Sequence, residues 1–201
     1  MTEPSPQHAT LLRAQDYRRM RWKNGAGWTT ELLRVPDSDD WCWRLSIAEV
    51  EADGPFSVYP GVERELMLLA GNGMRLYFED GVTQTLSPPR GSLRFAGERP
   101  LQGQLLDGPS RDFNVMWKRD EADARLWCRP LVGAMVLFVE PGETWVLHLL
   151  SGHARFSEES GLGRLESGDT AVLRASRRRA RYAVDGAGEA LLVRVEERGE
   201  R

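Results

Sequence analysis

Two arginines in this sequence stand where a charged side chain needs a partner. Arg44 alternates with apolar residues in the stretch WRLSIAEV, and Arg64 enters the apolar run RELMLLA. A buried arginine is costly unless it pairs with an acid or binds an anion, and its guanidinium group suits the two oxygens of a carboxylate. Either structural carboxylates such as Asp112 or Glu31 neutralise these arginines, or the arginines bind a small anionic ligand.

The stretch WKNGAGW, residues 22–28, adds a dense set of polar groups. Asn24 and Gly25 both accept positive φ, so a plain hairpin turn is the simplest interpretation. Lys23 and Asn24, followed closely by a threonine and a glutamate, nevertheless bring more donors and acceptors than a turn needs. The lysine precedes the glycines, which is not the order found in a nucleotide-phosphate loop. We therefore expect Lys23 and Asn24 to form the lip of a ligand pocket.

Further polar side chains fall on the same faces of two expected strands. Successive strand residues point to opposite faces, so Ser46 shares a face with Arg44, while Asn114 and Met116 share a face with Asp112 in DFNVM. The segment FSVYPG contributes two aromatic rings. We expect the arginines to bind a carboxylate, the lysine to add charge at the rim, and a methionine and a phenylalanine to form an apolar wall. The predicted ligand-binding residues are Lys23, Asn24, Arg44, Ser46, Phe56, Tyr59, Arg64, Asn114 and Met116.

The three histidines do not form a metal site by their spacing. His8 lies in an N-terminal tail that we expect to be mobile, and His148 and His153 are five residues apart across an expected turn. A divalent metal needs three or four converging nitrogen or oxygen donors. We therefore predict no metal, no cofactor and no catalytic residue set, with structural or surface roles for His148 and His153.

Composition narrows the class of protein further. The chain has 201 residues, 41% of them hydrophobic, and a formal charge of -3, which permits a buried core but supplies no overall attraction for nucleic acid. Cys42 and Cys128 are too few and too far apart for a disulfide scaffold or a zinc site. The opening MTEPSPQHAT lacks the order of a signal peptide, and no apolar run approaches the ~18 residues of a membrane helix. We expect a cytoplasmic protein without nucleic-acid or membrane partners.

The elements that must position the polar residues are short strands. Glycine and proline, 20 and 11 residues, punctuate segments rich in Val, Leu, Trp, Phe and Thr, as in β proteins with many tight turns. Helical periodicity is weak, and its best candidate, residues 118–127, predicts at most one or two turns of helix. The fold class is therefore predicted to be all-β.

A faint internal repeat predicts two similar units. RELMLLAGNGMRLYF, from Arg64, and TWVLHLLSGHARFS, from Thr144, each contain an apolar strand, a glycine break and a second strand. A repeat of this length fits two β-barrels or sandwiches in tandem, although chance similarity between leucine-rich strands is the alternative. We place the first cupin-like barrel, with the N-terminal strands, at residues 1–125 and the second at 126–201.

The run SRRRARY, residues 176–182, is the main basic feature of the second half. On an alternating strand Arg177, Arg179 and Arg181 share one face, which is typical of a solvated edge rather than a nucleic-acid site. We expect this run to cover the first barrel or to form a subunit contact in a homodimer.

Four segments together resemble the HutD/Ves family of bacterial bicupins. They are WKNGAGWTTEL, DWCWRLSIAEVEADGPFSVYPGVERELMLLAGNGM, LRFAGERP and LLDGPSRDFNVMWKR, and the resemblance runs from about Tyr17 to Arg119. It departs where Ala26 replaces a usual glycine and Arg21 a common proline. The family implies two cupin-like barrels packed together without metal. Its HutD branch implies a governor of histidine degradation that senses a formylated or imidazole-bearing intermediate, such as urocanate or formylglutamate.

Three classes of function remain open. The leading one is a ligand-binding or regulatory protein, because no nucleophile with an adjacent base is apparent. The second is a metal-independent isomerase or hydrolase of small carboxylic acids, with Lys23, Glu31 or Tyr59 as acid and base. The third is a stress-related interaction module. A pocket open to solvent and lined by Arg64 with a bound anion would favour the first two classes, and a collapsed lumen would favour the third.

Overall fold

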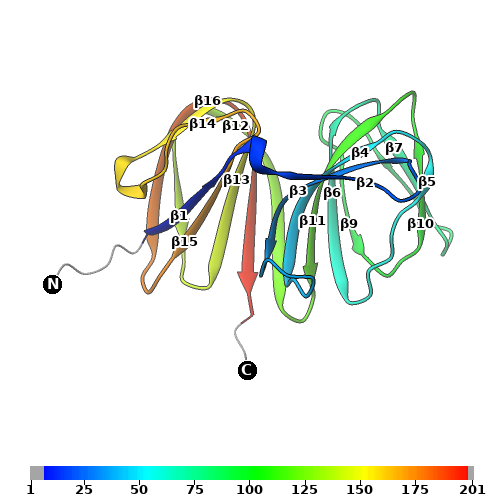
Figure 1. Cartoon of the computed structure of the whole chain (residues 1–201), viewed down its shortest axis with the longest axis horizontal. Coiled ribbons are helices and arrows are strands. Elements are labelled where there is room, and N and C mark those ends of the chain that lie inside the picture. The colour runs from blue at the N-terminus through cyan, green and yellow to red at the C-terminus, as the bar shows by residue number, and fades with distance from the viewer. Residues whose placement is uncertain (1–6, 199–201) are drawn as a thin grey trace. The chain divides into compact units, whose positions relative to one another are not determined.

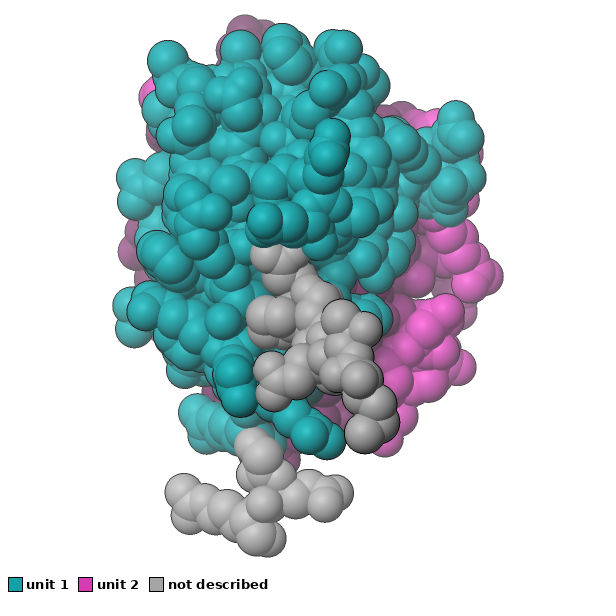
Figure 2. Space-filling model, turned by 90° about the vertical axis from the view of Figure 1, so that its left-hand side faces the viewer, with its two compact units in different colours: residues 1–17, 123–201 teal, residues 18–122 magenta. Residues whose placement is uncertain are grey.

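Strands make up nearly all the regular structure in the computed structural model, which describes residues 7–198 (Figure 1). These residues form sixteen strands and two 3-10 helices of three residues each, η1 (Ala14–Asp16) and η2 (Glu158–Ser160). They divide into two compact units, coloured separately in Figure 2: residues 18–122, and residues 7–17 together with 123–198. The predicted all-β fold with two cupin-like units is confirmed. Neither described helix has the length and apolar character needed to cross a membrane.

The unit of residues 18–122 contains two antiparallel sheets. In strand order, the larger sheet holds β2 (Arg18–Arg21), β3 (Gly27–Val35), β4 (Trp43–Val50), β11 (Ser110–Lys118), β6 (Val62–Ala70) and β9 (Ser92–Ala96). The smaller sheet holds β5 (Gly54–Pro55), β10 (Leu101–Leu105), β7 (Met74–Phe78) and β8 (Thr83–Leu86). Leucines 66 and 68 of β6 pack in one core cluster with Leu76 of β7 and Leu101 of β10. This apolar cluster therefore joins the two sheets.

Alternation along β4 and β11 places a polar face inside this unit. Trp43 and Leu45 lie on one face of β4 and are fully buried, while Arg44 and Ser46 lie on the other. Val50 shares the face of Arg44 by its even spacing, and it belongs to the core cluster that joins the two sheets. The polar residues of β4 therefore point toward the interior of the unit. The strands expected at WRLSIAEV and DFNVMW are β4 and part of β11.

The second unit is built on one six-stranded sheet. Its strand order is β1 (Gln7–Leu12), β15 (Thr170–Ala175), β13 (Glu143–Phe156), β16 (Ala180–Glu197) and β12 (Ala122–Val139), with β14 (Leu165–Glu166) pairing with β13. The N-terminal strands were expected in the first barrel, whereas β1 pairs with β15 of this sheet. His8 is therefore part of a strand, and its backbone N–H donates to Tyr182 Oη at 2.8 Å. The expectation that His8 lies in a mobile tail was wrong.

The two copies of the internal repeat differ at their glycines. The first copy breaks as expected: β6 ends at Ala70, and β7 begins after Gly73. In the second copy β13 runs through Gly152 without a break, and pairing with β16 shifts register just before it. A Cβ at Gly152 would lie 1.8 Å from Ala187 O, so glycine here permits the close approach of β13 and β16 just after the bulge. The expected turn between His148 and His153 is therefore absent, because both residues lie on the continuous strand β13.

Two further local expectations were wrong. Residues 118–127 form no helix: β11 ends at Lys118 and β12 begins at Ala122, and the lysine Nζ lies 2.9 Å from Glu121 Oε1 across the intervening turn. The arginine run lies mostly in the connection between β15 and β16, so only Arg181 of the expected three is on a strand. High charge in both segments marks exposed turns, where backbone groups reach solvent.

Candidate functional site

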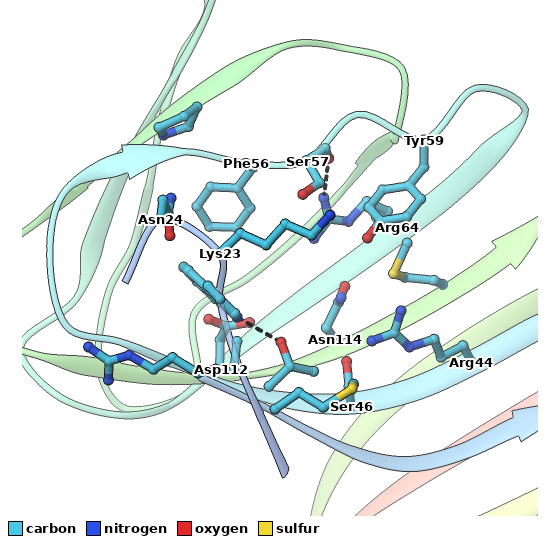
Figure 3. A pocket seen from close by; sticks show the side chains of 17 residues that line it. Lys23, Asn24, Arg44, Ser46, Phe56, Ser57, Tyr59, Arg64, Asp112 and Asn114 are labelled. Atoms are coloured by element: carbon cyan, nitrogen blue, oxygen red, sulfur yellow. Dashed lines mark hydrogen bonds between the residues drawn. The ribbon is translucent and has the colours of Figure 1, made fainter. Parts of the chain in front are cut away.

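One cavity of about 650 Å³ lies within the unit of residues 18–122 (Figure 3). All nine residues predicted to bind a ligand line it. The other lining residues, which the sequence analysis did not include in that set, are Met20, Arg21, Trp22, Thr29, Ala48, Pro55, Ser57 and Asp112. The structure therefore brings together side chains from five separate segments of the sequence.

The register of three neighbouring strands builds the floor of the cavity. Met116 on β11 lies opposite Arg44 on β4 and opposite Arg64 on β6. Asn114 lies opposite Ser46 in the next row of the same face. Strands are about 4.8 Å apart, so the backbones that carry the two arginines are separated by roughly 10 Å. This spacing lets both guanidinium groups face one small molecule.

Arg64 is buried, and no acid of residues 7–198 is in contact with it. Its side chain enters between three aromatic rings, with the guanidinium carbon 5.6, 5.5 and 5.3 Å from the ring centres of Phe56, Tyr59 and Phe95. Arg64 Nη1 donates to the carbonyl oxygen of Ser57 at 3.2 Å, whereas Nε has no hydrogen-bond partner within the described chain. Burial lowers the pKa of Arg64 because it removes water from the charged form.

Arg44, in contrast, has a structural acid beside it. Arg44 Nε lies 3.1 Å from Glu31 Oε2, although without hydrogen-bond geometry, and Glu31 Oε1 lies 3.7 Å from Arg34 Nε. A bulge in β3 between Glu31 and Leu33 places Arg34 opposite Arg44, so one carboxylate serves two arginines. Glu31 does not line the cavity, and this pairing makes it unsuited to the acid–base role considered above.

Asp112 is the only acid among the described residues that line the cavity. It is fully buried, and neither carboxyl oxygen has a hydrogen-bond partner in residues 7–198. Burial raises the pKa of Asp112 to about 7, while the positive charge of Arg64 opposes that shift. Its place on the face of Asn114 and Met116 is visible in the sequence, which leaves it as one of two candidate structural counter-ions for the arginines. The structure shows no ion pair between Asp112 and either cavity-floor arginine among the described residues.

The lip is the hairpin between β2 and β3. Gly25 N–H donates to Trp22 O and Ala26 N–H donates to Asn24 Oδ1, at 3.0 and 3.1 Å. Asn24 therefore uses its side-chain oxygen to form the turn and keeps its amide nitrogen for other contacts. Lys23 is exposed and extends over the cavity in Figure 3, and no ion pair to it occurs within the described chain. The turn and the pocket are thus both built from the same residues.

The walls are apolar and close-packed on one side. Phe56 and Met116 line the cavity as expected. Gly103 on β10 makes room for the phenylalanine, because a Cβ there would lie 2.7 Å from Phe56 Cε2. Trp22 Nε1 donates to Thr29 Oγ1 at 2.8 Å, which fixes the indole beside the cavity. Alternation along β4 could have identified Ala48, but the loop residues carry no such periodic signal.

The arrangement suits a small anion with an apolar part. Four cationic side chains line the cavity against one acid, so the local charge is positive although the whole chain is acidic. No histidine lines it, and His148 lies in the other unit, where its Nδ1 is 2.9 Å from Thr170 Oγ1. Within residues 7–198 no group of three or more His, Cys, Asp or Glu side chains is placed to hold a metal ion.

Comparisons with known proteins point to one family. The family model described as HutD matches residues 14–192. An uncharacterised 21.2 kDa protein in the hutC 3′ region of Pseudomonas putida is 43% identical over 118 residues, covering 58% of this chain and 62% of that protein. Protein Ves of Cronobacter sakazakii is 41% identical over 106 residues, covering 52% of this chain and 58% of that protein. The chain thus spans less than two thirds of the length of these relatives.

A solved structure extends the similarity over nearly the whole chain. HutD from Pseudomonas fluorescens SBW25, solved in a formate condition, has a TM-score of 0.81 and 27% sequence identity. The similarity covers 96% of this chain and all of the other. The second unit, where the sequence resemblance was loose, is therefore included in the structural match.

Proposed function

The chain belongs to the HutD family, which is linked to the histidine utilisation locus, and from that premise we propose that it binds a small carboxylate and regulates histidine utilisation as a sensor. The ligand would be an intermediate of the pathway, such as urocanate or formylglutamate. The arginines bind the carboxylate, Asn114 and Ser46 orient the molecule, and Phe56 with Met116 covers its apolar part.

The burial of Arg64 without an acid in contact among the described residues is the observation that supports this proposal. A buried guanidinium that lacks an acid in contact is costly, and such a cost is typical of a site that is completed by a ligand. The surrounding aromatic rings hold the group in place and exclude water, which strengthens its attraction for an anion. A purely structural arginine would be expected to resemble Arg44, which has Glu31 beside it.

An enzyme remains the second candidate, and one observation favours it. Asp112 has a pKa of about 7, the range in which a carboxyl group can both accept and donate a proton at neutral pH. Lys23 and Tyr59 also line the cavity, whereas Glu31 does not. Turnover of a small acid that is lost in a Lys23→Ala variant would support an enzyme, and binding without turnover would support a sensor. The open cavity gives no support to the interaction-module alternative.

Calorimetric titration with urocanate, formylglutamate and formate tests the proposal directly. We expect saturable binding of at least one of these carboxylates to the wild-type protein. The variant Arg64→Lys keeps a positive charge but loses the planar fork of donors, so we expect a loss of affinity of about tenfold or more. The absence of heat with all three carboxylates would contradict the proposal.

Arg111→Lys is the matched control. Arg111 lies on β11, is exposed and does not line the cavity. The same exchange at this position should leave affinity within about twofold, because it keeps the charge and Arg111 does not line the cavity. Equal losses in both variants would indicate a nonspecific effect of the Arg→Lys exchange rather than an anion site at Arg64.

A further inference from the structure

Asp112 presents a problem that anion binding alone does not solve. A carboxylate is the wrong partner for an incoming anion, because two like charges in a buried site repel each other. Yet Asp112 lines the same cavity as the two floor arginines. Its two oxygens are buried and have no hydrogen-bond partner in the described chain, so the protein itself does not account for them.

The neighbours of Asp112 do not neutralise it. Ala48 lies opposite on β4 and Leu68 lies opposite on β6, so both flanking strands present apolar side chains. The ionisable groups that line the cavity around it are Arg64 from β6, Arg44 from β4, Tyr59 from the segment after β5, and Arg21 and Lys23 from the lip. None of these is within ion-pair distance of Asp112 among the described residues.

The cations that surround Asp112 are partly engaged elsewhere. Arg44 lies beside Glu31, and Arg21 Nη1 lies 2.7 Å from Glu51 Oε2. Arg64 is the charge with the clearest influence on Asp112. When an anion occupies Arg64, that influence is cancelled, and the neutral form of Asp112 is favoured further. A neutral carboxyl group can then donate its hydrogen to an oxygen of the anion.

We infer that Asp112 is a ligand-binding residue that meets the anion as a neutral acid, so that above neutral pH each bound carboxylate is accompanied by the uptake of one proton. This inference rests on the proposed function and adds the protonation state and the stoichiometry of binding. It also restricts the chemical class of the ligand. The group beside Asp112 must accept a hydrogen bond, as a carboxylate or formyl oxygen does and an ammonium group does not.

The inference fixes the sign of the pH dependence. The unbound Asp112 has a pKa of about 7, and the bound anion raises it further. Below pH 7 the proton is already present, so affinity is constant. Above pH 7 the proton must be taken up on binding, so the dissociation constant rises up to tenfold per pH unit until the pKa of the complex is reached. We expect the dissociation constant at pH 8 to be about tenfold that at pH 6.

Formate and N-formylglutamate are the appropriate probes. Their carboxyl groups titrate near pH 4 and stay ionised between pH 6 and 8, whereas the imidazole of urocanate titrates near pH 6.5. Calorimetry at pH 8 in Hepes and in Tris, which differ in their heat of ionisation, counts the protons taken up. We expect close to one proton per carboxylate bound in the wild-type protein and none in Asp112→Asn, with a flat affinity from pH 6 to 8 in the variant.

Asp120→Asn is the matched control, since Asp120 is exposed and does not line the cavity. This control should keep the pH dependence and the proton uptake of the wild type. Binding without proton uptake in the wild-type protein would overturn the inference and leave the proposed function standing. Absence of binding at every pH would overturn both. The wild-type proton count needs no variant, so a misfolded Asp112→Asn protein would not prevent the decision.

Discussion

Arg44 and Arg64 flank Met116 on either side, yet their surroundings differ. Arg44 lies beside Glu31, whereas Arg64 is enclosed by aromatic rings and contacts no acid in the described chain. The sequence left two alternatives open for both residues, namely a structural ion pair or a ligand. The structure separates their surroundings: Arg44 lines the cavity with a structural acid beside it, and the ligand role is argued most strongly for Arg64. The aromatic enclosure could not be predicted, because Phe56, Tyr59 and Phe95 belong to different segments.

The buried carboxyl group of Asp112 should also make the stability of the protein depend on pH. Its pKa in the folded state is about 7, above the value near 3.9 of an unfolded chain, so folding favours the protonated form. The wild type is therefore most stable below pH 4 as far as this group is concerned, and it loses that contribution as pH rises from 4 to 7. Asp112→Asn removes this loss. We therefore expect the free energy of unfolding of the variant, relative to that of the wild type, to rise between pH 4 and 8 by an amount on the order of 4 kcal/mol at most.

Urea denaturation of both proteins at pH 4.5, 6 and 8 measures this difference. Asp120→Asn, at an exposed position, should parallel the wild type throughout. Unfolding free energies of Asp112→Asn and wild type that differ by the same amount at every pH would show that Asp112 is ionised in the folded protein.

At the scale of elements, alternation was the informative signal. The alternation of polar and apolar residues in WRLSIAEV and DFNVM correctly predicted strands β4 and β11 and the face that carries their polar side chains. This is possible because side chains alternate strictly along a strand. Pairing of β4 with β11 and of β11 with β6 was not visible, since it depends on contacts distant in sequence. The glycine of the second repeat was misinterpreted for a related reason: Gly152 marks a close approach of β16, which local sequence cannot show.

The two glycines of the lip hairpin, Gly25 and Gly27, should differ in how much an alanine substitution destabilises the protein. A Cβ on Gly27 would lie 2.2 Å from Glu49 O, a backbone atom of the neighbouring strand, so β3 and β4 would have to separate. Gly25 has positive φ of 73° but nothing within 4 Å of the added Cβ. We expect Gly27→Ala to lower the free energy of unfolding by roughly 3 kcal/mol and Gly25→Ala by about 1 kcal/mol.

Chemical denaturation of the two variants checks the order of these effects. Only the larger change should also weaken carboxylate binding, because it moves the strand that carries Thr29 and the loop that carries Lys23. Equal destabilisation by both substitutions would show that backbone conformation, rather than the close approach to β4, is what Gly27 provides.

At the scale of the whole molecule, the two units share an all-β architecture but not their chemistry. Every buried side-chain polar atom without a hydrogen-bond partner in the described chain belongs to the unit of residues 18–122. In the other unit the buried polar groups satisfy one another: Tyr17 Oη lies 2.6 Å from Thr170 Oγ1, which also contacts His148. Burial raises the pKa of Tyr17 to about 12, which keeps its hydroxyl protonated and in place.

This division predicts where a ligand will act. All the residues that line the cavity lie between Met20 and Met116, so its occupation should stabilise the unit of residues 18–122 directly. Hydrogen exchange of the full chain, with and without saturating N-formylglutamate, should show slower exchange in β4, β6, β11 and the lip, and unchanged exchange in β13, β15 and β16. Slower exchange in the latter strands would contradict this prediction and would show that the second unit responds to the ligand. The control is the Arg64→Lys variant at a ligand concentration near the wild-type dissociation constant, where its weaker binding should leave the cavity mostly empty and give less protection than in the wild type. Equal protection of both proteins at that concentration would show that the slower exchange does not depend on the guanidinium group.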